Sequence, residues 1–242
     1  CLGAHSAEEL VVQVDEADAL LVFHEVTLPR QIIERLRRRR VVVRCGTGCD
    51  QIDLAAATEH RIPVCNVPDY GVDEVADHAI ALLLACNRGL LLVERRLRSS
   101  LAPWNYHAVE PLFRLAGATM GVIGLGRIRT AAALRAKGLR MHVLAHDPYL
   151  RPGHEKAVGV PLVTRERLLA ESDVVSLHVP LTDETRNLID AAALGRMQPH
   201  ALLINTSRGA VVDATALSRA LLEQRIGGAG IDVLPSKPPA AN

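Results

Sequence analysis

Residues 120–149 read MGVIGLGRIRTAAALRAKGLRMHVLAHDPY, and this stretch decides which fold the sequence predicts. It opens with an apolar run, passes through Gly124 and Gly126, continues as an Ala- and Leu-rich segment, and ends in a second apolar run that leads to Asp147. Short apolar runs bounded by turn residues are typical of buried strands. The order of strand, glycine turn, helix, strand and acid predicts a βαβ unit.

The two glycines and the acid of this unit fit a dinucleotide. Gly124 permits the tight turn at the end of the strand, and Gly126 lets the backbone approach a pyrophosphate, which the free N–H groups of the helix N-terminus attract. Asp147 follows the glycines by about twenty residues, where its carboxylate can accept hydrogen bonds from both hydroxyls of an adenosine ribose. Because a carboxylate there repels a 2′-phosphate, the sequence favours NAD over NADP.

One position departs from the G-x-G-x-x-G motif. The third glycine would be residue 129, which is an arginine. Since that glycine normally allows the helix to pack closely on the strand, we expect the Arg129 side chain either to swing out or to push the helix away. An ordinary βαβ unit with a glycine turn and an acid remains the alternative interpretation.

Composition indicates a soluble globular protein with one large or two ordinary domains in 242 residues. A net charge of +1 argues against a nucleic-acid partner. The five cysteines lack paired spacing, which favours a reducing, cytoplasmic location and predicts no metal site. No apolar run is long enough for a membrane span. The first residue is Cys1 rather than methionine, which suggests that residues are missing at the start.

Strands alternate with helices throughout the chain, which predicts parallel strands joined by crossover helices. Strands are predicted at residues 19–22, 41–44, 62–66, 173–178, 201–205 and 228–233, besides the two in the glycine unit. Helices are predicted at residues 29–40, 54–60, 164–172, 191–197 and 214–224. A single long helix over residues 73–98, interrupted only by Gly89, would lead into a loop over residues 99–115.

Five segments of the chain resemble the D-isomer-specific 2-hydroxyacid dehydrogenases, the family of phosphoglycerate, glycerate and formate dehydrogenases. They are RCGTGCDQID (44–53), GVIGLGRI (121–128), HVPL (178–181), INTSRGAVVD (204–213) and GIDV (230–233). VVVRCGTGCDQIDLAAA, together with DPYL, is similar to the C-terminal-binding-protein corepressors of the same superfamily. The resemblance extends from about residue 7 to residue 239. It implies an α/β protein with parallel strands in both domains: an incomplete flavodoxin-like substrate domain over residues 1–92 and a doubly wound, Rossmann-type NAD-binding domain over residues 93–242.

The resemblance also implies a set of site residues. The backbone of Gly46, Thr47 and Gly48 would hold the substrate carboxylate. Arg208 would be the catalytic arginine that pairs with the carboxylate and carbonyl of a 2-keto acid, because a guanidinium donates two parallel hydrogen bonds. The residues that would contact NAD are Thr47, Gly124, Gly126, Arg127, Ile128, Asp147, His178, Val179, Pro180, Thr206, Ser207, Arg208 and Asp232. Among these, Arg127 and Ile128 would meet the pyrophosphate, and Asp232 the nicotinamide carboxamide.

The implied reaction is hydride transfer between the nicotinamide and C2 of the acid, with a histidine moving the proton and a glutamate orienting that histidine. Lys237 stands where the family has the glutamate, and Arg140 stands where the family often has glycine. A cation beside an imidazole lowers its pKa. The family histidine would lie beyond Asn242, so we expect the sequence to be a fragment.

Two functions of different classes follow from the resemblance. The first is a cytoplasmic, dimeric NAD-dependent oxidoreductase acting on a small D-2-hydroxy acid or its 2-keto form. The second is a catalytically weak, dimeric binding protein of the corepressor type that senses NAD(H), and Arg129 and Lys237 motivate it. The intact carboxylate-binding elements favour the enzyme.

Overall fold

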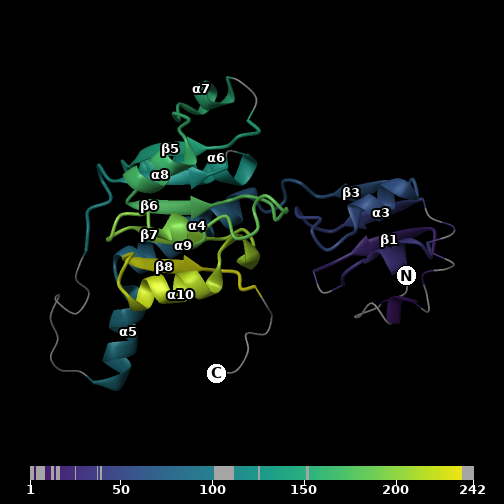
Figure 1. Ribbon diagram of the computed structural model, residues 1–242, viewed down its shortest axis with the longest axis horizontal. Helices are drawn as coiled ribbons and strands as arrows, with labels where there is room; N and C mark the ends of the chain where they lie inside the picture. Colours follow the sequence, from purple (N-terminus) through teal and green to yellow (C-terminus); the bar gives the residue numbers. More distant parts are fainter. Residues whose placement is uncertain are drawn as a thin grey trace. The chain divides into compact units, whose positions relative to one another are not determined.

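The computed structural model of the protein describes residues 3, 9–11, 14, 17–24, 26–36, 38, 40–100, 112–124, 126–150 and 153–235. The chain forms two compact units, Cys1–Tyr70 and Gly71–Asn242 (Figure 1). The predicted boundary after residue 92 falls later than this division. The reason is helix α4 (Val72–Asn87), whose buried Ala79 and Leu83 belong to a core of the second unit.

The first unit contains a parallel sheet in the order β1-β2-β3, flanked by helices, which is the layered arrangement expected of a flavodoxin-like domain. Its elements are β1 (Ala19–Val22), α2 (Arg30–Ile33), β2 (Val41–Arg44), α3 (Leu54–Glu59) and β3 (Val64–Asn66). The helix predicted over residues 29–40 ends at Ile33, because the arginine-rich continuation offers the core only Leu36 among its described residues. Asp53 caps α3 by accepting a hydrogen bond from the N–H of Ala56.

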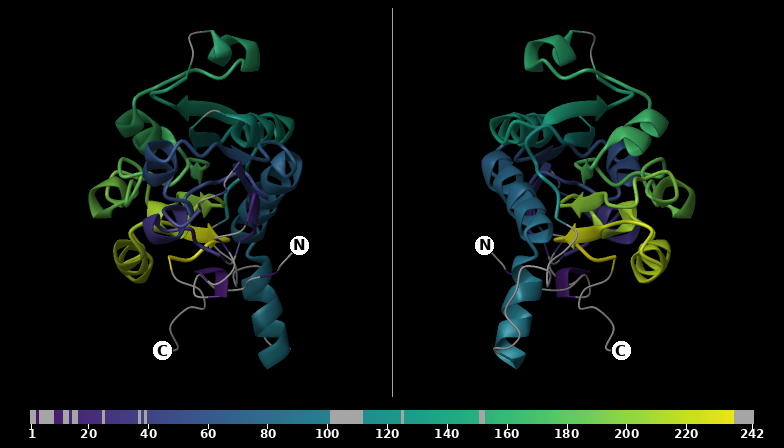
Figure 2. Two further views of the ribbon diagram at one scale, coloured as in Figure 1. Left: turned by 90° about the vertical axis from the view of Figure 1, so that its right-hand side faces the viewer. Right: turned by 90° about the vertical axis from the view of Figure 1, so that its left-hand side faces the viewer.

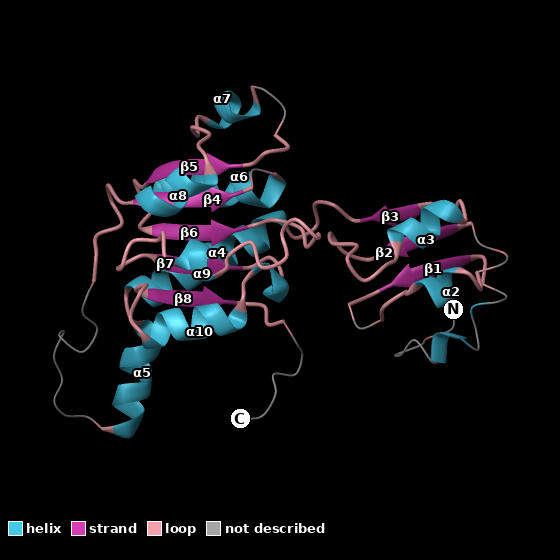
Figure 3. Cartoon of the chain, viewed as in Figure 1, coloured by secondary structure: helices cyan, strands magenta, loops and turns pink. Residues whose placement is uncertain are grey.

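The second unit is built on a parallel sheet in the order β5-β4-β6-β7-β8, whose strand arrows point the same way in Figure 3. The strands are β4 (Thr119–Ile123), β5 (His142–His146), β6 (Val174–Leu177), β7 (Leu202–Asn205) and β8 (Gly228–Ile231). A parallel bridge from Leu162 to Ala145 extends the sheet beyond β5. The chain therefore leaves β4 toward β5 and returns on the other side as β6. Ligands of such sheets bind where the strand order reverses, beyond the carboxyl ends of the strands.

Helices cover both faces of this sheet, which confirms the doubly wound, Rossmann-type prediction (Figure 1). One face is covered by α4 and α6 (Arg127–Gly138), whose buried alanines pack on the sheet residues Met120 and Val122. The other face is covered by α8 (Arg165–Glu171), α9 (Ala191–Leu194) and α10 (Ala214–Leu222). Thr164 caps α8, as its hydroxyl accepts from the N–H of Arg167.

The single long helix predicted over residues 73–98 is broken at Gly89, which has a φ of 60°. It consists of α4 and α5 (Leu90–Ser99), which are bent by 55° relative to each other, and α5 projects away from the sheet (Figure 2). In the described part of the chain, no helix by itself is long and apolar enough to cross a membrane; α4 and α5 meet that criterion only as a bent pair. Most of the predicted loop over residues 99–115 lies outside the described residues.

Within the described residues, α7 (His154–Val158) and a 3-10 turn at Gly209–Val211 escaped prediction. Both are too short to show a period in the sequence. Arg140 has a φ of 60°, in the left-handed region that glycine adopts without strain. The family's frequent glycine at this position thus has a conformational reason.

Candidate functional site

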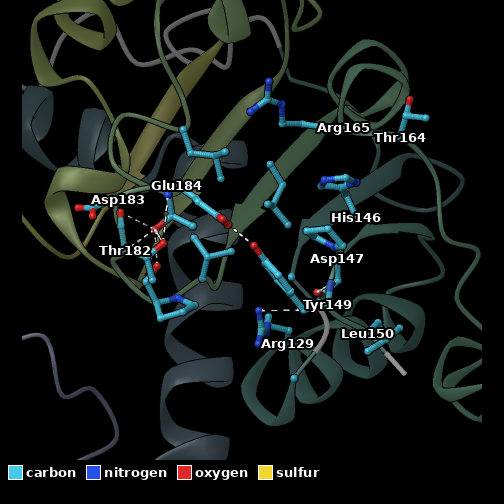
Figure 4. A pocket seen from close by; sticks show the side chains of 18 of the residues that line it. Arg129, His146, Asp147, Tyr149, Leu150, Thr164, Arg165, Thr182, Asp183 and Glu184 are labelled. Atoms are coloured by element: carbon cyan, nitrogen blue, oxygen red, sulfur yellow. Dashed lines mark hydrogen bonds and ion pairs between the residues drawn. The ribbon is translucent and has the colours of Figure 1, made fainter. Parts of the chain in front are cut away.

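A pocket of about 1260 Å³ lies at the carboxyl ends of β4, β5 and β6 (Figure 4). It is formed by the turn after β4, the segment after β5, the N-terminus of α8 and the segment after β6. The lining residues are Ile123, Gly124, Gly126, Arg129, His146, Asp147, Pro148, Tyr149, Leu150, Thr164, Arg165, Glu166, Val179, Pro180, Thr182, Asp183, Glu184, Thr185 and Leu188. The pocket lies where the strand order reverses, which is the place where sheets of this kind bind their ligands.

The turn after β4 requires glycine at its first position. Gly124 has a φ of +92°, and its N–H donates to the carbonyl of His146 on β5 at 2.6 Å. A side chain at this φ would be strained. Gly126 is the N-cap of α6, so the pocket wall includes the helix end at which backbone N–H groups attract anions.

Arg129 folds back over this glycine turn. A Cβ built on Gly124 would lie 1.9 Å from Arg129 Nη1, and one built on Gly126 would lie 2.5 Å from Nη2. The expectation that the arginine would swing out or displace the helix is therefore wrong on both counts. Helix α6 keeps its packing, because Ala132 and Ala133 remain completely buried.

Arg129 and Asp147 form an ion pair inside the pocket, with 3.9 Å between Nη1 and Oδ2 (Figure 4). The two side chains are 20% and 11% exposed, so solvent screens the pair only in part. Burial lowers the pKa of Arg129, and the charge of Asp147 acts in the opposite direction. The guanidinium remains charged, because arginine keeps its proton in proteins.

Tyr149 connects two segments that line the pocket. Its hydroxyl donates to the carboxylate of Glu184, and these two side chains point toward one another in Figure 4. This contact raises the pKa of Tyr149. The Tyr149 N–H also donates to Asp147 Oδ1 at 2.9 Å, which fixes the carboxylate at the end of β5. Sequence reasoning did not identify Tyr149 or Glu184 as site residues; the DPYL segment was the available signal for the tyrosine.

His178 does not line the pocket. It is buried, with 8% of the residue exposed, next to the lining residue Val179. Its Nε2 lies 2.9 Å from Ser176 Oγ. Burial, followed by the positive charge of Arg129, lowers the pKa of His178 to about 3. The imidazole is therefore neutral at physiological pH and cannot carry a proton there.

We expect His178→Gln to weaken the dependence of the free energy of unfolding on pH at acidic pH. Between the ordinary pKa of 6.5 and the folded value of about 3, the unfolded chain binds a proton that the folded chain does not. The stabilisation from this group is thus complete above the unfolded pKa and is lost as the pH falls through that window. Urea midpoints measured across the window should fall less steeply for the variant, and parallel curves would show that the imidazole titrates normally.

The ends of β7 and β8 hold four of the predicted residues. Asn205 shapes the turn after β7, because its Oδ1 accepts from the N–H and the hydroxyl of Ser207, and its Nδ2 donates to the carbonyl of Arg208 at 3.0 Å. Arg208 Nη1 donates to the carbonyl of Ser207 at 2.8 Å. Thr206 Oγ1 is buried without a hydrogen-bond partner among the described residues, so this atom is available to a ligand.

Asp232 follows β8 directly. Its N–H donates to the carbonyl of Asn205 at 3.0 Å, which keeps the ends of β7 and β8 together. Its Oδ1 lies 3.1 Å from Nε2 of His78, on α4, and both side chains are about half exposed. The histidine on the long helix therefore has a structural contact with a predicted cofactor residue.

The first unit contains the predicted carboxylate loop at the end of β2. Gly46 accepts a hydrogen bond from the N–H of Val67, and the carbonyl of Thr47 accepts one from the Asn66 side chain, so β3 supports the loop. The buried guanidinium of Arg44 lies against Gly46, since a Cβ there would be 1.8 Å from Nη1. A larger residue at position 46 would require the Arg44 guanidinium to move.

The structure thus gathers part of the predicted set in one pocket: Gly124, Gly126, Asp147, Val179 and Pro180. Arg127 and Ile128 belong to the first turn of α6 without lining this pocket. The remaining predicted residues lie at the ends of β6, β7 and β8 or in the first unit, and Lys237 lies outside the described residues. Within the described ranges, no cluster of His, Cys, Asp or Glu side chains could hold a metal ion.

Comparison with known proteins gives three informative matches. Residues 80–242 match the family model for the D-isomer specific 2-hydroxyacid dehydrogenase, NAD binding domain. The chain is 40% identical over 234 residues to a glyoxylate reductase of Korarchaeum cryptofilum, which covers 96% of this chain and 70% of that protein. It is 36% identical over 230 residues to a D-3-phosphoglycerate dehydrogenase of Mycobacterium leprae, which covers 95% of this chain and 43% of that protein.

Among solved structures, D-lactate dehydrogenase from Aquifex aeolicus, complexed with NAD and lactic acid, superposes with a TM-score of 0.87. Its sequence identity with this chain is 31%, and the match covers 95% of this chain and 68% of that one.

Proposed function

Since the chain belongs to the D-isomer-specific 2-hydroxyacid dehydrogenase family, we propose that it is an NAD-dependent oxidoreductase acting on a small D-2-hydroxy acid or its 2-keto form. The observation that carries this proposal is the convergence of Gly124, Gly126 and Asp147 on one pocket at the reversal of strand order. Hydride would be exchanged between the nicotinamide and C2 of the acid. The relatives reported above do not support the corepressor alternative.

The residues of the pocket fit NAD. Gly124 and Gly126 add no side chain where a pyrophosphate would approach the turn, and Asp147 presents a carboxylate suited to ribose hydroxyls. The buried hydroxyl of Thr206 lacks a partner among the described residues. Among the described residues of the turn and its surroundings, Arg129 is the obstacle, and its long side chain can rotate away. NAD, when bound, supplies the carbon that carries the hydride.

We assign the remaining roles as parts of the same proposal. Arg208 holds and orients the carboxylate and carbonyl of the acid, and the backbone of residues 46–48 adds hydrogen bonds to the carboxylate. Asp232 accepts from the nicotinamide carboxamide. The other proposed NAD contacts are Thr47, Arg127, Ile128, His178, Val179, Pro180, Thr206 and Ser207. His178 contributes as a neutral group, because its pKa of about 3 excludes it as the proton carrier.

We also propose a homodimer and a cytoplasmic location. The dimer is supported by α5, on which Leu90, Leu91, Leu92 and Leu97 are exposed, because a run of exposed leucines on one helix favours burial against a second copy. The location is supported by four free thiols, at Cys45, Cys49, Cys65 and Cys86.

The proposed function predicts that the full-length protein binds NADH and oxidises it when a 2-keto acid is added. Nicotinamide fluorescence reports binding, and loss of NADH absorbance with glyoxylate, pyruvate or hydroxypyruvate reports turnover. Mixtures without keto acid or without protein serve as controls. NADH binding without oxidation by any of the three acids would contradict the dehydrogenase and favour nucleotide sensing, and absence of NADH binding would contradict both functions.

A further inference from the structure

Arg129 occupies the face of the glycine turn that a dinucleotide needs. Its two terminal nitrogens lie where side chains on Gly124 and Gly126 would be, at 1.9 Å and 2.5 Å from the built Cβ positions. Glycine is required at such a turn so that phosphate can approach the backbone. In this position the guanidinium leaves no room for a pyrophosphate against the backbone of the turn, so it must move when a dinucleotide binds.

A dinucleotide also competes for the partner of Arg129. Arg129 Nη1 lies 3.9 Å from Asp147 Oδ2 and forms an ion pair with it. In the proposed site, the same carboxylate accepts the hydroxyls of the adenosine ribose. An arginine that leaves the turn and loses this carboxylate must pair with an anionic group of the dinucleotide, since an unpaired cation is costly in a partly buried site.

The other charged groups around the pocket are already engaged or lie in other segments. Arg165 is 3.7 Å from Glu166, and Glu184 accepts the hydrogen bond of Tyr149. His146 Nδ1 is 3.0 Å from the carbonyl of Val163, and Asp183 is in the segment after β6. Arg129, at 3.9 Å from Asp147 Oδ2, is therefore a cation that opposes the charge of this carboxylate inside the pocket.

A 2′-phosphate on the ribose offers the anion that Arg129 needs. Arg129 is in the first turn of α6, so its backbone stays beside the ribose subsite when the side chain rotates out of the glycine turn. A guanidinium binds phosphate through two parallel hydrogen bonds, whereas an unphosphorylated ribose presents no anion. We propose that Arg129 is a specificity-determining residue that allows the nucleotide site to accept NADP(H), which Asp147 alone would repel. This inference rests on the proposed dinucleotide-dependent function.

The test is a pair of fluorescence titrations, with NADH and with NADPH, on the full-length protein and two variants at constant ionic strength. Arg129→Met keeps most of the side-chain volume and removes the charge, whereas Arg129→Gly removes both. We expect both variants to raise the ratio of the NADPH to the NADH dissociation constant by about tenfold, because the Arg129 charge no longer offsets the repulsion between Asp147 and a 2′-phosphate. Arg129→Gly should in addition bind NADH more tightly than the parent, because the turn is open.

Arg219→Gln is the matched control, because it removes an exposed arginine of α10 that does not line the pocket. It should leave the ratio of the two dissociation constants unchanged. An unchanged ratio in Arg129→Met, or an equal change in Arg219→Gln, would overturn the selective role while leaving the proposed function intact. Failure of the parent and all variants to bind either nucleotide would overturn the proposed function and this inference together. Circular dichroism of each variant verifies folding, and Arg129→Met keeps the test decisive if the glycine variant unfolds.

Discussion

Arg208→Gln is expected to lower kcat/KM for reduction of the preferred 2-keto acid by about a thousandfold, or roughly 4 kcal/mol of transition-state stabilisation. The loss follows from the chemistry of the proposed role, in which one planar guanidinium donates to both the carboxylate and the carbonyl. The amide of glutamine is neutral and cannot supply the charge. Affinity for NADH, measured by fluorescence, should change much less than kcat/KM.

The geometry around Arg208 explains why so large an effect is expected from one side chain. Asn205 holds the turn through three hydrogen bonds, one of which goes to the Arg208 carbonyl. The backbone of Leu234 and Pro235 lies so close to Gly209 that a Cβ there would be 2.2 Å from the Leu234 carbonyl carbon. An arginine whose backbone is fixed on both sides reaches its ligand with little loss of entropy.

Two further variants separate the role of Arg208 from a general effect of charge. Arg208→Lys retains the charge but loses the planar pair of donors, so it should recover only a small part of the lost kcat/KM. Arg219→Gln removes an exposed arginine from α10 in the same unit and should behave like the parent. Near-normal kcat/KM in Arg208→Gln would remove this residue from the proposed substrate site.

Much of the fold could be predicted because a buried strand requires apolar residues, which appear in the sequence as a short apolar run. The predictions for β1 and β2 coincide with the observed strands, since each run is bounded by polar or turn residues. Helix ends were less well predicted, because they depend on what the core accepts. The arginine-rich segment beyond Ile33 has a composition typical of helices but offers few apolar side chains to the core. Helix α4 ends before Gly89, whose left-handed backbone conformation separates it from α5.

The glycine turn and Asp147 could be predicted because their function dictates both residue type and spacing. The position of the Arg129 side chain could not, since the motif states that glycine is usual at this position but does not indicate where an arginine would point. The Tyr149 to Glu184 contact joins segments 35 residues apart. Such a contact depends on the packing of two strand ends, which no local pattern encodes.

Gly121→Val is expected to lower the free energy of unfolding by about 3 kcal/mol, which is a fall in Tm of about 10 °C for a domain of this size. Gly121 lies in β4 under helix α8. A Cβ at this position would be 2.3 Å from Ser172 Oγ and 2.5 Å from Leu168 Cδ2. Both neighbours are completely buried, and the Ser172 hydroxyl is held by the carbonyl of Leu168 at 2.6 Å, so neither side chain can move aside freely.

The cause of this loss can be isolated by combining Gly121→Val with Leu168→Ala. Leu168→Ala alone should cost about 3 kcal/mol through the cavity it leaves. In the double variant the valine fills part of that cavity. The double variant should therefore lose less free energy of unfolding than the sum of the losses in the two single variants. Gly138→Ala, at a helical glycine with no atom within 4 Å of the added Cβ, should not destabilise the protein. Additive costs in the double variant would mean that the close approach of α8 to β4 is not what requires glycine at this position.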